Sequence, residues 1–266
     1  MKIFDAHCHI YPAIIAEKAA AATAKFYEGL GITLDGTIKT LFDHSGDITM
    51  HLVQSVATTQ AQVHSVNNFI AREVAQYPNR LYGFGTLHQD STSEDIQQLR
   101  DLGLHGVKLH PDIQKFQLDD PRIFKLCEEL EGELTLLIHT GDIRYDFSNP
   151  NRLIPLLKAF PKLKVIGAHF GGHSLWDEAV RSLAGKFDNL WVDCSSSFFA
   201  MTREQARNLI HIFGTDRVLF GTDYPMWSPK AELTYFRSLE LPQEEQEAIL
   251  WNNAAKLFDL PERNET

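Results

Sequence analysis

Eight short apolar runs recur along the chain, and stretches of helical character separate them. The runs cover residues 2–6, 50–57, 81–86, 106–109, 134–138, 163–168, 190–194 and 218–221. Several are continuous in Val, Ile, Leu and Phe, as is typical of parallel strands buried on both faces. Strands that alternate with helices predict a parallel sheet. Eight such units in 266 residues fit an α/β fold of the (β/α)8 TIM-barrel type, which needs about 250 residues. We therefore expect a single domain over residues 1–266.

The connections between the runs predict the helices of this barrel. We expect them at residues 14–29, 37–44, 60–77, 93–102, 121–130, 152–160, 174–187, 203–213, 229–239, 243–250 and 252–257. Thr92 and Thr202 precede acidic first turns, as capping residues do. An open doubly wound sheet is the alternative, but the glycine-rich fingerprint of its nucleotide-binding forms is missing, because Gly83 and Gly85 lack the third glycine.

Composition limits the partners and the compartment. Lys and Arg number 25 and Asp and Glu 35, a net charge of −10 with no basic run, so we expect neither nucleic acid nor a membrane surface as partner. No apolar stretch approaches the roughly 18 residues of a membrane helix, and no signal peptide is recognisable. Three cysteines without a CxxC pair favour a reducing cytoplasm. A small-molecule substrate is the partner that remains.

The first run ends in a pair of histidines, His7 and His9. Side chains alternate across a strand, so these two share one face while Cys8 points to the other. In a barrel the inward face at the end of a strand lies at the mouth, where active sites of this fold are found. Two imidazoles placed in this way can chelate one metal ion.

Other runs end in ligand-type residues at matching positions. Lys108 and His139 are 31 residues apart, His139 and His169 are 30 apart, and Asp193 and Asp223 are also 30 apart. Each interval is about one strand–helix unit, so these side chains recur at one height around the barrel. Imidazole and carboxylate suit Zn²⁺, with Mn or Fe possible. We expect one divalent metal, held by His7, His9, His139 and Asp223, with one position open for water or substrate.

These residues resemble the pattern of the amidohydrolase superfamily, in the branch that also contains metal-dependent decarboxylases. The pattern has HxH on the first strand, histidines on the fifth and sixth, and an aspartate on the eighth. Here it is matched by His7 and His9, His139, His169 and Asp223. The strings GVKLHP at 106–111, GTDYP at 221–225 and NAAKLF at 253–258 resemble this branch too. The resemblance covers essentially the whole chain and implies nothing about the substrate.

The resemblance implies roles for individual residues. His169 would lie beside the metal-bound water or substrate and transfer a proton, and Asp223 would bind metal and also accept a proton from that water. In binuclear relatives a lysine at the position of Lys108 is carboxylated and bridges two metals. Otherwise Lys108 would be a cation that pairs with a substrate carboxylate. We expect the mononuclear form. Relatives are often dimers, so a homodimer is possible.

Several further residues are candidates on position alone. His110, Arg144 and Trp227 follow strand ends and could bind substrate, and Tyr145 lies in the same loop as Arg144. Asp193 and Ser195 could orient metal ligands. We expect structural or exposed positions for the remaining histidines, which are His44, His51, His64, His88, His105, His173 and His211.

Three hypotheses for function follow. The first is a hydrolase in which a metal-activated water attacks a C–O or C–N bond of a lactone or amide. The alternative is a decarboxylase of a small aromatic or unsaturated acid, with His169 or Asp223 protonating the carbon. The third, from another class, is a barrel that binds metal or a ligand without catalysis. A serine hydrolase is disfavoured because the chain has no GxSxG motif.

Overall fold

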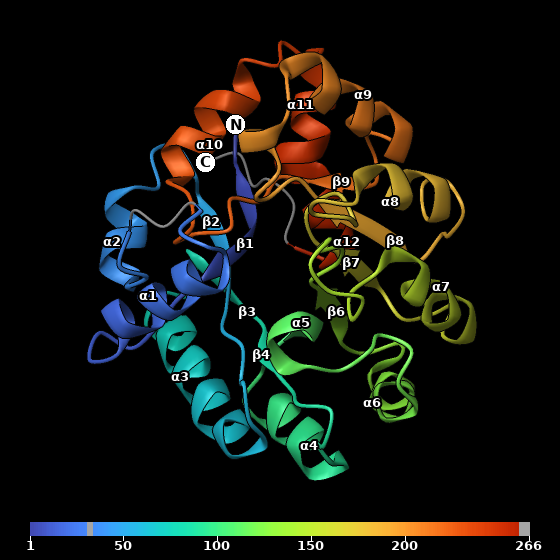
Figure 1. The fold of residues 1–266 in the computed structure, drawn as a ribbon. Coiled ribbons are helices and arrows are strands. Elements are labelled where there is room, and N and C mark those ends of the chain that lie inside the picture. Colours follow the sequence, from blue (N-terminus) through green and yellow to red (C-terminus); the bar gives the residue numbers. More distant parts are fainter. Residues whose placement is uncertain (31–33, 261–266) are drawn as a thin grey trace.

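The computed structural model describes residues 1–30 and 34–260, and its strands are all parallel. Figure 1 shows the strands at the centre and the helices around them. The strands are β1 (Phe4–His9), β2 (Met50–Gln54), β3 (Leu81–Gly83), β4 (Gly85–Thr86), β5 (Gly106–Leu109), β6 (Thr135–Ile138), β7 (Val165–Gly167), β8 (Leu190–Asp193) and β9 (Val218–Leu219).

These strands close into a barrel. Hydrogen bonds order them as β1-β2-β3 and as β4 through β9, and β3 and β4 are two halves of one strand interrupted at Phe84. The gap between β9 and β1 is bridged by backbone bonds, including Ala6 N–H to the Phe220 carbonyl at 2.8 Å. Eight strand positions therefore form a ring, which confirms the predicted TIM barrel.

Helices lie between successive strands, largely where the sequence predicts them. They are α1 (Ala16–Phe26), α2 (Ile38–Asp43), α3 (Val63–Gln76), α4 (Ser93–Asp101), α5 (Pro111–Gln114), α6 (Pro121–Leu130), α7 (Pro150–Ala159), α8 (Trp176–Ser182), α9 (Arg203–Phe213), α10 (Pro229–Arg237), α11 (Gln243–Glu247) and α12 (Asn253–Leu257). Capping boxes at Thr92 and Thr202 start α4 and α9, as expected. The four-residue α5 is not foreseen in the sequence. The helix expected at 14–29 is shorter in the structure, where it covers only α1.

Apolar side chains form two layers of core. The inner layer fills the barrel with one or two residues from most strands and is closed at the end away from the mouth by α12; it contains Phe4, Ala6, Leu52, Phe84, Leu137, Ile166, Ala168, Leu219, Ala254, Leu257 and Phe258. The outer layer lies between the strands and the helices. Leu137 is fully buried in the inner layer. Truncating Leu137 to Ala would lower the free energy of unfolding by about 2–5 kcal/mol.

A bulge in β1 changes which side chains face inward. Asp5 pairs with His51 of β2 and Cys8 pairs with Val53, so three residue steps on β1 match two on β2. Phe4 and Ala6 belong to the inner core, whereas Cys8 belongs to the outer one. The bulge thus leaves Asp5 on the outer face and turns both histidines of β1 toward the barrel interior.

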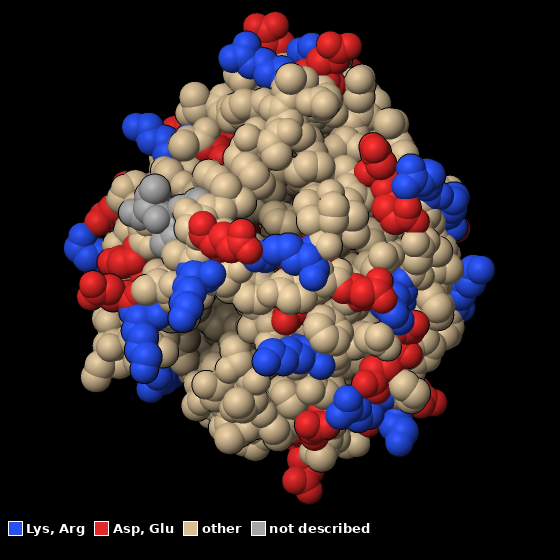
Figure 2. All heavy atoms as spheres, viewed as in Figure 1, with Lys and Arg blue, Asp and Glu red and all other residues tan. Residues whose placement is uncertain are grey.

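The surface carries both signs of charge. Lys and Arg side chains are interspersed with Asp and Glu on the face in Figure 2, so over the residues drawn there no broad patch of one sign forms. Within the described parts of the chain, no helix is both long enough and apolar enough to cross a membrane.

Candidate metal centre at the mouth of the barrel

Three predicted ligands converge where β1 and β9 end. The Nε2 atoms of His7 and His9 are 3.2 Å apart. Asp223 Oδ1 lies 3.4 Å from the first of these nitrogens and 3.5 Å from the second. Ligand atoms about 2.1 Å from one ion in a tetrahedron lie about 3.4 Å from one another. The three side chains therefore have the spacing of a metal-binding triangle.

A carboxylate fixes the tautomer of His7. Asp193 Oδ2 is 3.0 Å from His7 Nδ1, and both side chains are fully buried. The other oxygen of Asp193 accepts from the backbone N–H of Ser195 at 3.0 Å and from that of His169 at 3.2 Å. A carboxylate held in this way accepts the Nδ1 proton of His7 and leaves a lone pair on Nε2 for a metal. This geometry is compatible with the expected orienting role of Asp193, which stays a prediction.

Burial keeps the imidazoles neutral. It is the main cause that holds the pKa of His7 well below its ordinary value, and the Lys108 ammonium adds to it. The pKa of His9 is lowered in the same way, by burial first and then by His7. Neutral imidazole is the form that binds metal. Burial also raises the pKa of Asp223, against a hydrogen bond from Ser196 and the charge of Lys108.

Lys108 reaches the same cluster from β5. Its side chain is fully buried, and Nζ lies 3.1 Å from His7 Nε2. Burial lowers its pKa, while Asp193 and Asp223 act in the opposite direction. The lysine therefore stands beside the predicted metal position, where it could serve as a cation or, if carboxylated, as a bridge. Which of these roles it has stays a prediction.

His139 lies in a neighbouring group and not in the triangle. Its Nδ1 is 3.0 Å from His169 Nε2, and its Nε2 is 3.5 Å from Asp112 Oδ2. His169 Nδ1 lies 2.9 Å from the Ser195 carbonyl, to which it must donate. The hydrogen bonds then place a proton on His139 Nδ1 and leave Nε2 with a free lone pair. That nitrogen is buried without a hydrogen-bond partner among the described residues.

His110 packs against His139 and is engaged at both ring nitrogens. The two rings stack with centroids 3.9 Å apart. His110 Nδ1 accepts from the Ile113 N–H and caps α5, and Nε2 is 2.9 Å from the Tyr27 hydroxyl. Tyr27, just after α1, belongs to this group as well, since its ring centroid lies 5.8 Å from that of His173. The sequence does not reveal it, because it lies in the first long connection and outside any strand end.

The two other candidate substrate-binding residues differ in their surroundings. Arg144 donates through Nε and Nη2 to Asp142 at 3.0 and 2.7 Å and through Nη1 to the Phe26 carbonyl at 2.6 Å. These bonds tie the loop after β6 to the end of α1. Trp227 donates through Nε1 to Ser196 Oγ at 2.8 Å, and Ser196 in turn donates to Asp223. Substrate contact by either residue remains a prediction.

His173 is not the isolated histidine that the sequence suggests. It is buried, and its ring centroid lies 5.3 Å from that of His169, 5.7 Å from that of His139 and 5.8 Å from that of Tyr27. It therefore forms part of the wall of the site. The sequence offers no signal for this, because His173 lies five residues past the end of the apolar run at 163–168, beyond a pair of glycines.

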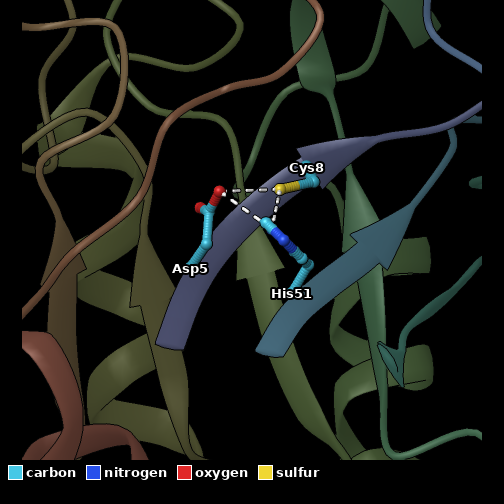
Figure 3. Close-up of side chains that lie close together, drawn as sticks. All are labelled: Asp5, Cys8 and His51. Carbon is cyan, nitrogen blue, oxygen red and sulfur yellow. Dashed lines mark hydrogen bonds and ion pairs between the residues drawn. The ribbon is translucent and has the colours of Figure 1, made fainter. Parts of the chain in front are cut away.

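A buried polar network supports β1 from outside the barrel. Figure 3 shows Asp5 and Cys8 of β1 pointing toward His51 of β2. Asp5 accepts from Cys8 Sγ at 2.9 Å, from Thr222 Oγ1 at 2.7 Å and from the backbone N–H of Thr222 at 3.0 Å. It also accepts from the N–H of His7 at 3.2 Å. Asp5 thereby joins the strand that carries the histidines to the segment that carries Asp223.

Backbone strain gathers at this end of the barrel. Five non-glycine residues with positive φ follow β7, β8 and β9: His169 (61°), Phe170 (52°), His173 (28°), Ser196 (44°) and Asp223 (59°). Such conformations cost about 1–3 kcal/mol each and cluster at functional sites. The strain supports assigning function to this mouth.

The donor set fits a divalent cation. The triangle has tetrahedral spacing, its imidazoles are neutral, and the unpartnered nitrogen of His139 is a ligand atom without another use. His7, His9 and Asp223 would hold the ion. His139 as the fourth ligand stays a prediction, because its free nitrogen faces Asp112 in this structure.

Comparison with known proteins agrees with this architecture. A 2-amino-3-carboxymuconate-6-semialdehyde decarboxylase of Dictyostelium discoideum is 27% identical over an alignment 244 positions long, which covers 73% of this chain and 66% of that protein, slightly under two thirds. A gamma-resorcylate decarboxylase of Polaromonas sp. is 25% identical over an alignment 282 positions long, which covers 83% of this chain and 86% of that one.

A solved structure has the same fold. A dihydroxybenzoic acid decarboxylase from Polaromonas sp. JS666, with bound manganese and an inhibitor, superposes with a TM-score of 0.71 at 17% identity, over 98% of each chain. The family model described as amidohydrolase matches residues 4–260. That match takes in every strand of the barrel and the three clustered ligands, so the chain belongs to the amidohydrolase family.

Proposed function

We propose that this protein is a metal-dependent decarboxylase of a small unsaturated or aromatic carboxylic acid. Both relatives described above carry decarboxylase names, which favours this alternative over the hydrolase that the sequence analysis puts first. The observation that carries the proposal is the buried Lys108 ammonium at 3.1 Å from His7 Nε2. It supplies a cation for a carboxylate directly beside the predicted metal.

The metal ligands and Lys108 offer two neighbouring positively charged positions for an acidic substrate. A divalent cation held by His7, His9 and Asp223 would draw electron density from a substrate oxygen. Lys108 would pair with the substrate carboxylate or with the oxygen next to it. Burying that ammonium beside the cluster is costly unless an anion pairs with it. A substrate with a negative charge therefore fits this pocket better than a neutral lactone or amide.

The reaction balances with one proton from the protein. The bond between the carboxyl group and its carbon breaks, CO₂ leaves, and the electron pair stays on that carbon. We assign the proton that this carbon then takes up to His169. Its Nδ1 is fixed by the Ser195 carbonyl, and its Nε2 faces His139 at 3.0 Å. In the neutral tautomer that nitrogen accepts from His139, so His169 would first take up a proton from solvent at Nε2. Burial, and after it His7, lower the pKa of His169, so the imidazolium gives that proton up readily.

The test is a panel of aromatic and unsaturated acids with protein loaded with Zn or Mn. Headspace CO₂ is measured beside the loss of substrate absorbance. We expect CO₂ in step with substrate loss and about one metal ion per chain. Hydrolysis of lactones or amides without CO₂ would return the protein to the hydrolase hypothesis. Two ions per chain with dependence on bicarbonate would identify Lys108 as a carboxylated bridge.

His169→Asn separates proton transfer from binding. We expect this variant to bind metal and substrate nearly as the wild type does and to lose turnover by about 10²–10⁴-fold. An unchanged rate would remove His169 from the reaction and leave Asp223 as the proton donor. Metal binding with no turnover of any acid, lactone or amide would favour the non-catalytic hypothesis.

A further inference from the structure

Gln54 ends β2 on the inner face of the barrel. It pairs in register with His9, one of the predicted ligands. Leu52, two residues earlier on the same strand, belongs to the inner core, so alternation directs the Gln54 side chain into the barrel as well. The residue is fully buried. A primary amide therefore lies inside the mouth, beside the metal cluster.

Neither end of this amide has a partner among the residues that the structure describes. Both Nε2 and Oε1 of Gln54 are buried and lack a hydrogen bond to any residue in 1–30 or 34–260. The conclusion does not depend on which atom is nitrogen, since both are unpaired. Buried polar groups in folded proteins are nearly always paired, and leaving them unpaired is costly.

Another buried glutamine shows what a structural role looks like in this chain. Gln114 is also buried, but its Nε2 donates to the carbonyls of Ala57 and Leu87, both at 2.8 Å, and its Oε1 accepts from the His110 N–H at 2.8 Å. It ties three loops together. Gln54 makes no such bond within the described part of the chain, so it contributes nothing comparable to the fold there.

Other unpaired polar atoms lie at the same end of the barrel. Of seven buried side-chain atoms without a partner in the described residues, two belong to Gln54 and three to Asp112, His139 and His173. The latter three side chains come from the segments that follow β5, β6 and β7, where His139 Nε2 lies 3.5 Å from Asp112 Oδ2 and the rings of His139 and His173 have centroids 5.7 Å apart. Polar groups left unsatisfied together at one end of the barrel are the pattern expected where a polar ligand completes the hydrogen bonding.

We propose that Gln54 binds the substrate of the proposed decarboxylase through both ends of its amide. Nε2 donates to an oxygen of the substrate carboxylate, and Oε1 accepts from a hydroxyl or amino group next to that carboxylate. The pocket therefore selects acids that carry a hydrogen-bond donor beside the carboxyl group. This assignment rests on the proposed function for the class of substrate, and on the unpaired amide for the residue.

Thermal unfolding gives the first test. Gln54→Leu removes the amide and keeps nearly the same volume, and Gln114→Leu is the matched control. Replacing an unpaired buried amide by an apolar group of similar shape is neutral or stabilising, whereas removing a paired one is not. We expect the Tm of the first variant to equal or exceed that of the wild type and the Tm of the second to fall by several degrees. A clear fall for Gln54→Leu would show that its amide has a structural role and would overturn the proposal.

Ligand binding gives the second test. The dissociation constants of 2-hydroxybenzoate and benzoate are measured calorimetrically with metal-loaded protein. We expect the wild type to prefer 2-hydroxybenzoate, and Gln54→Leu to bind it about tenfold or more weakly and to lose the preference. Equal affinity of wild type and variant would refute the role of Gln54, as would failure of the wild type to bind either acid. Binding that depends on Gln54 in a protein that releases no CO₂ would refute the proposed reaction alone.

Discussion

Replacing Asp193 by Asn tests how the cluster prepares His7 for a metal. The carboxylate accepts the proton of His7 Nδ1 at 3.0 Å. If the amide NH₂ of Asn takes that position, it donates to Nδ1 and forces the proton of His7 onto Nε2, the nitrogen that faces Asp223. Loss of such an orienting partner weakens metal binding by about 10–100-fold, or about 1.4–2.8 kcal/mol.

The opposite orientation of the amide also has a cost. Its oxygen would then accept from His7, but its NH₂ would face the backbone N–H groups of Ser195 and His169, which Asp193 Oδ1 now accepts at 3.0 and 3.2 Å. Donors would face donors in a fully buried site. The penalty for buried groups left unpaired is about 1–3 kcal/mol each. Either orientation therefore lowers metal affinity or stability.

The assay is a competition between protein and a chromophoric chelator for Zn²⁺. Asp188→Asn is the control, since it removes the same charge from an exposed residue shortly before β8. Near-UV circular dichroism and Tm verify the fold of both variants. We expect only Asp193→Asn to lose affinity. A Zn²⁺ dissociation constant within twofold of the wild type, in a variant with an unchanged Tm, would refute the reasoning.

Three further predictions concern stability and turnover. Thr222→Val removes the 2.7 Å hydrogen bond to the buried carboxylate of Asp5 and should lower the free energy of unfolding by roughly 1–3 kcal/mol in urea titrations; an unchanged midpoint would contradict the bracing role. Burial raises the pKa of Glu232 from its ordinary 4.5 to about 8, so the folded chain keeps a proton that the unfolded chain has lost, and stability falls as the pH rises from about 4.5 to about 8. Glu232→Gln should therefore raise Tm at pH 8 and leave it nearly unchanged at pH 4.5, and equal shifts at both values would disprove the assignment. Asp223→Asn should abolish turnover of any substrate found and lower the metal content per chain, so an active variant would exclude the cluster as the reaction centre.

The sequence predicts the barrel and the residues at its mouth because both follow from periodicity. Buried runs mark the strands, and inward residues at strand ends must gather at one opening. His7, His9 and Asp223 lie together for this reason, although the inward direction of the two histidines also needs the bulge in β1. Lys108 lies close to His7 for the same reason, because it too is near the end of a strand and points inward.

Residues outside that rule escape prediction. Tyr27 and His173 enter the site from connections, whose paths depend on packing between distant segments. Gln54 does end a strand, but a neutral amide is not a ligand-type residue and only its missing partners reveal it. His139 ends the expected strand, yet the orientation of its ring follows from His110 and His169, which spacing along the chain does not determine.

The bulge in β1 bears on how distant sequences should be compared with this one. A string of the form DxHxH in a regular strand would direct all three side chains to the same face. Here the additional residue of the bulge points the Asp5 side chain out of the barrel and both histidine side chains into it. Five consecutive positions thus supply a structural carboxylate on one face and two predicted metal ligands on the other. A homologue with the same letters but without the insertion would put a carboxylate among its imidazoles. Its charge and choice of ion would then differ, although an alignment would score the two strands as identical.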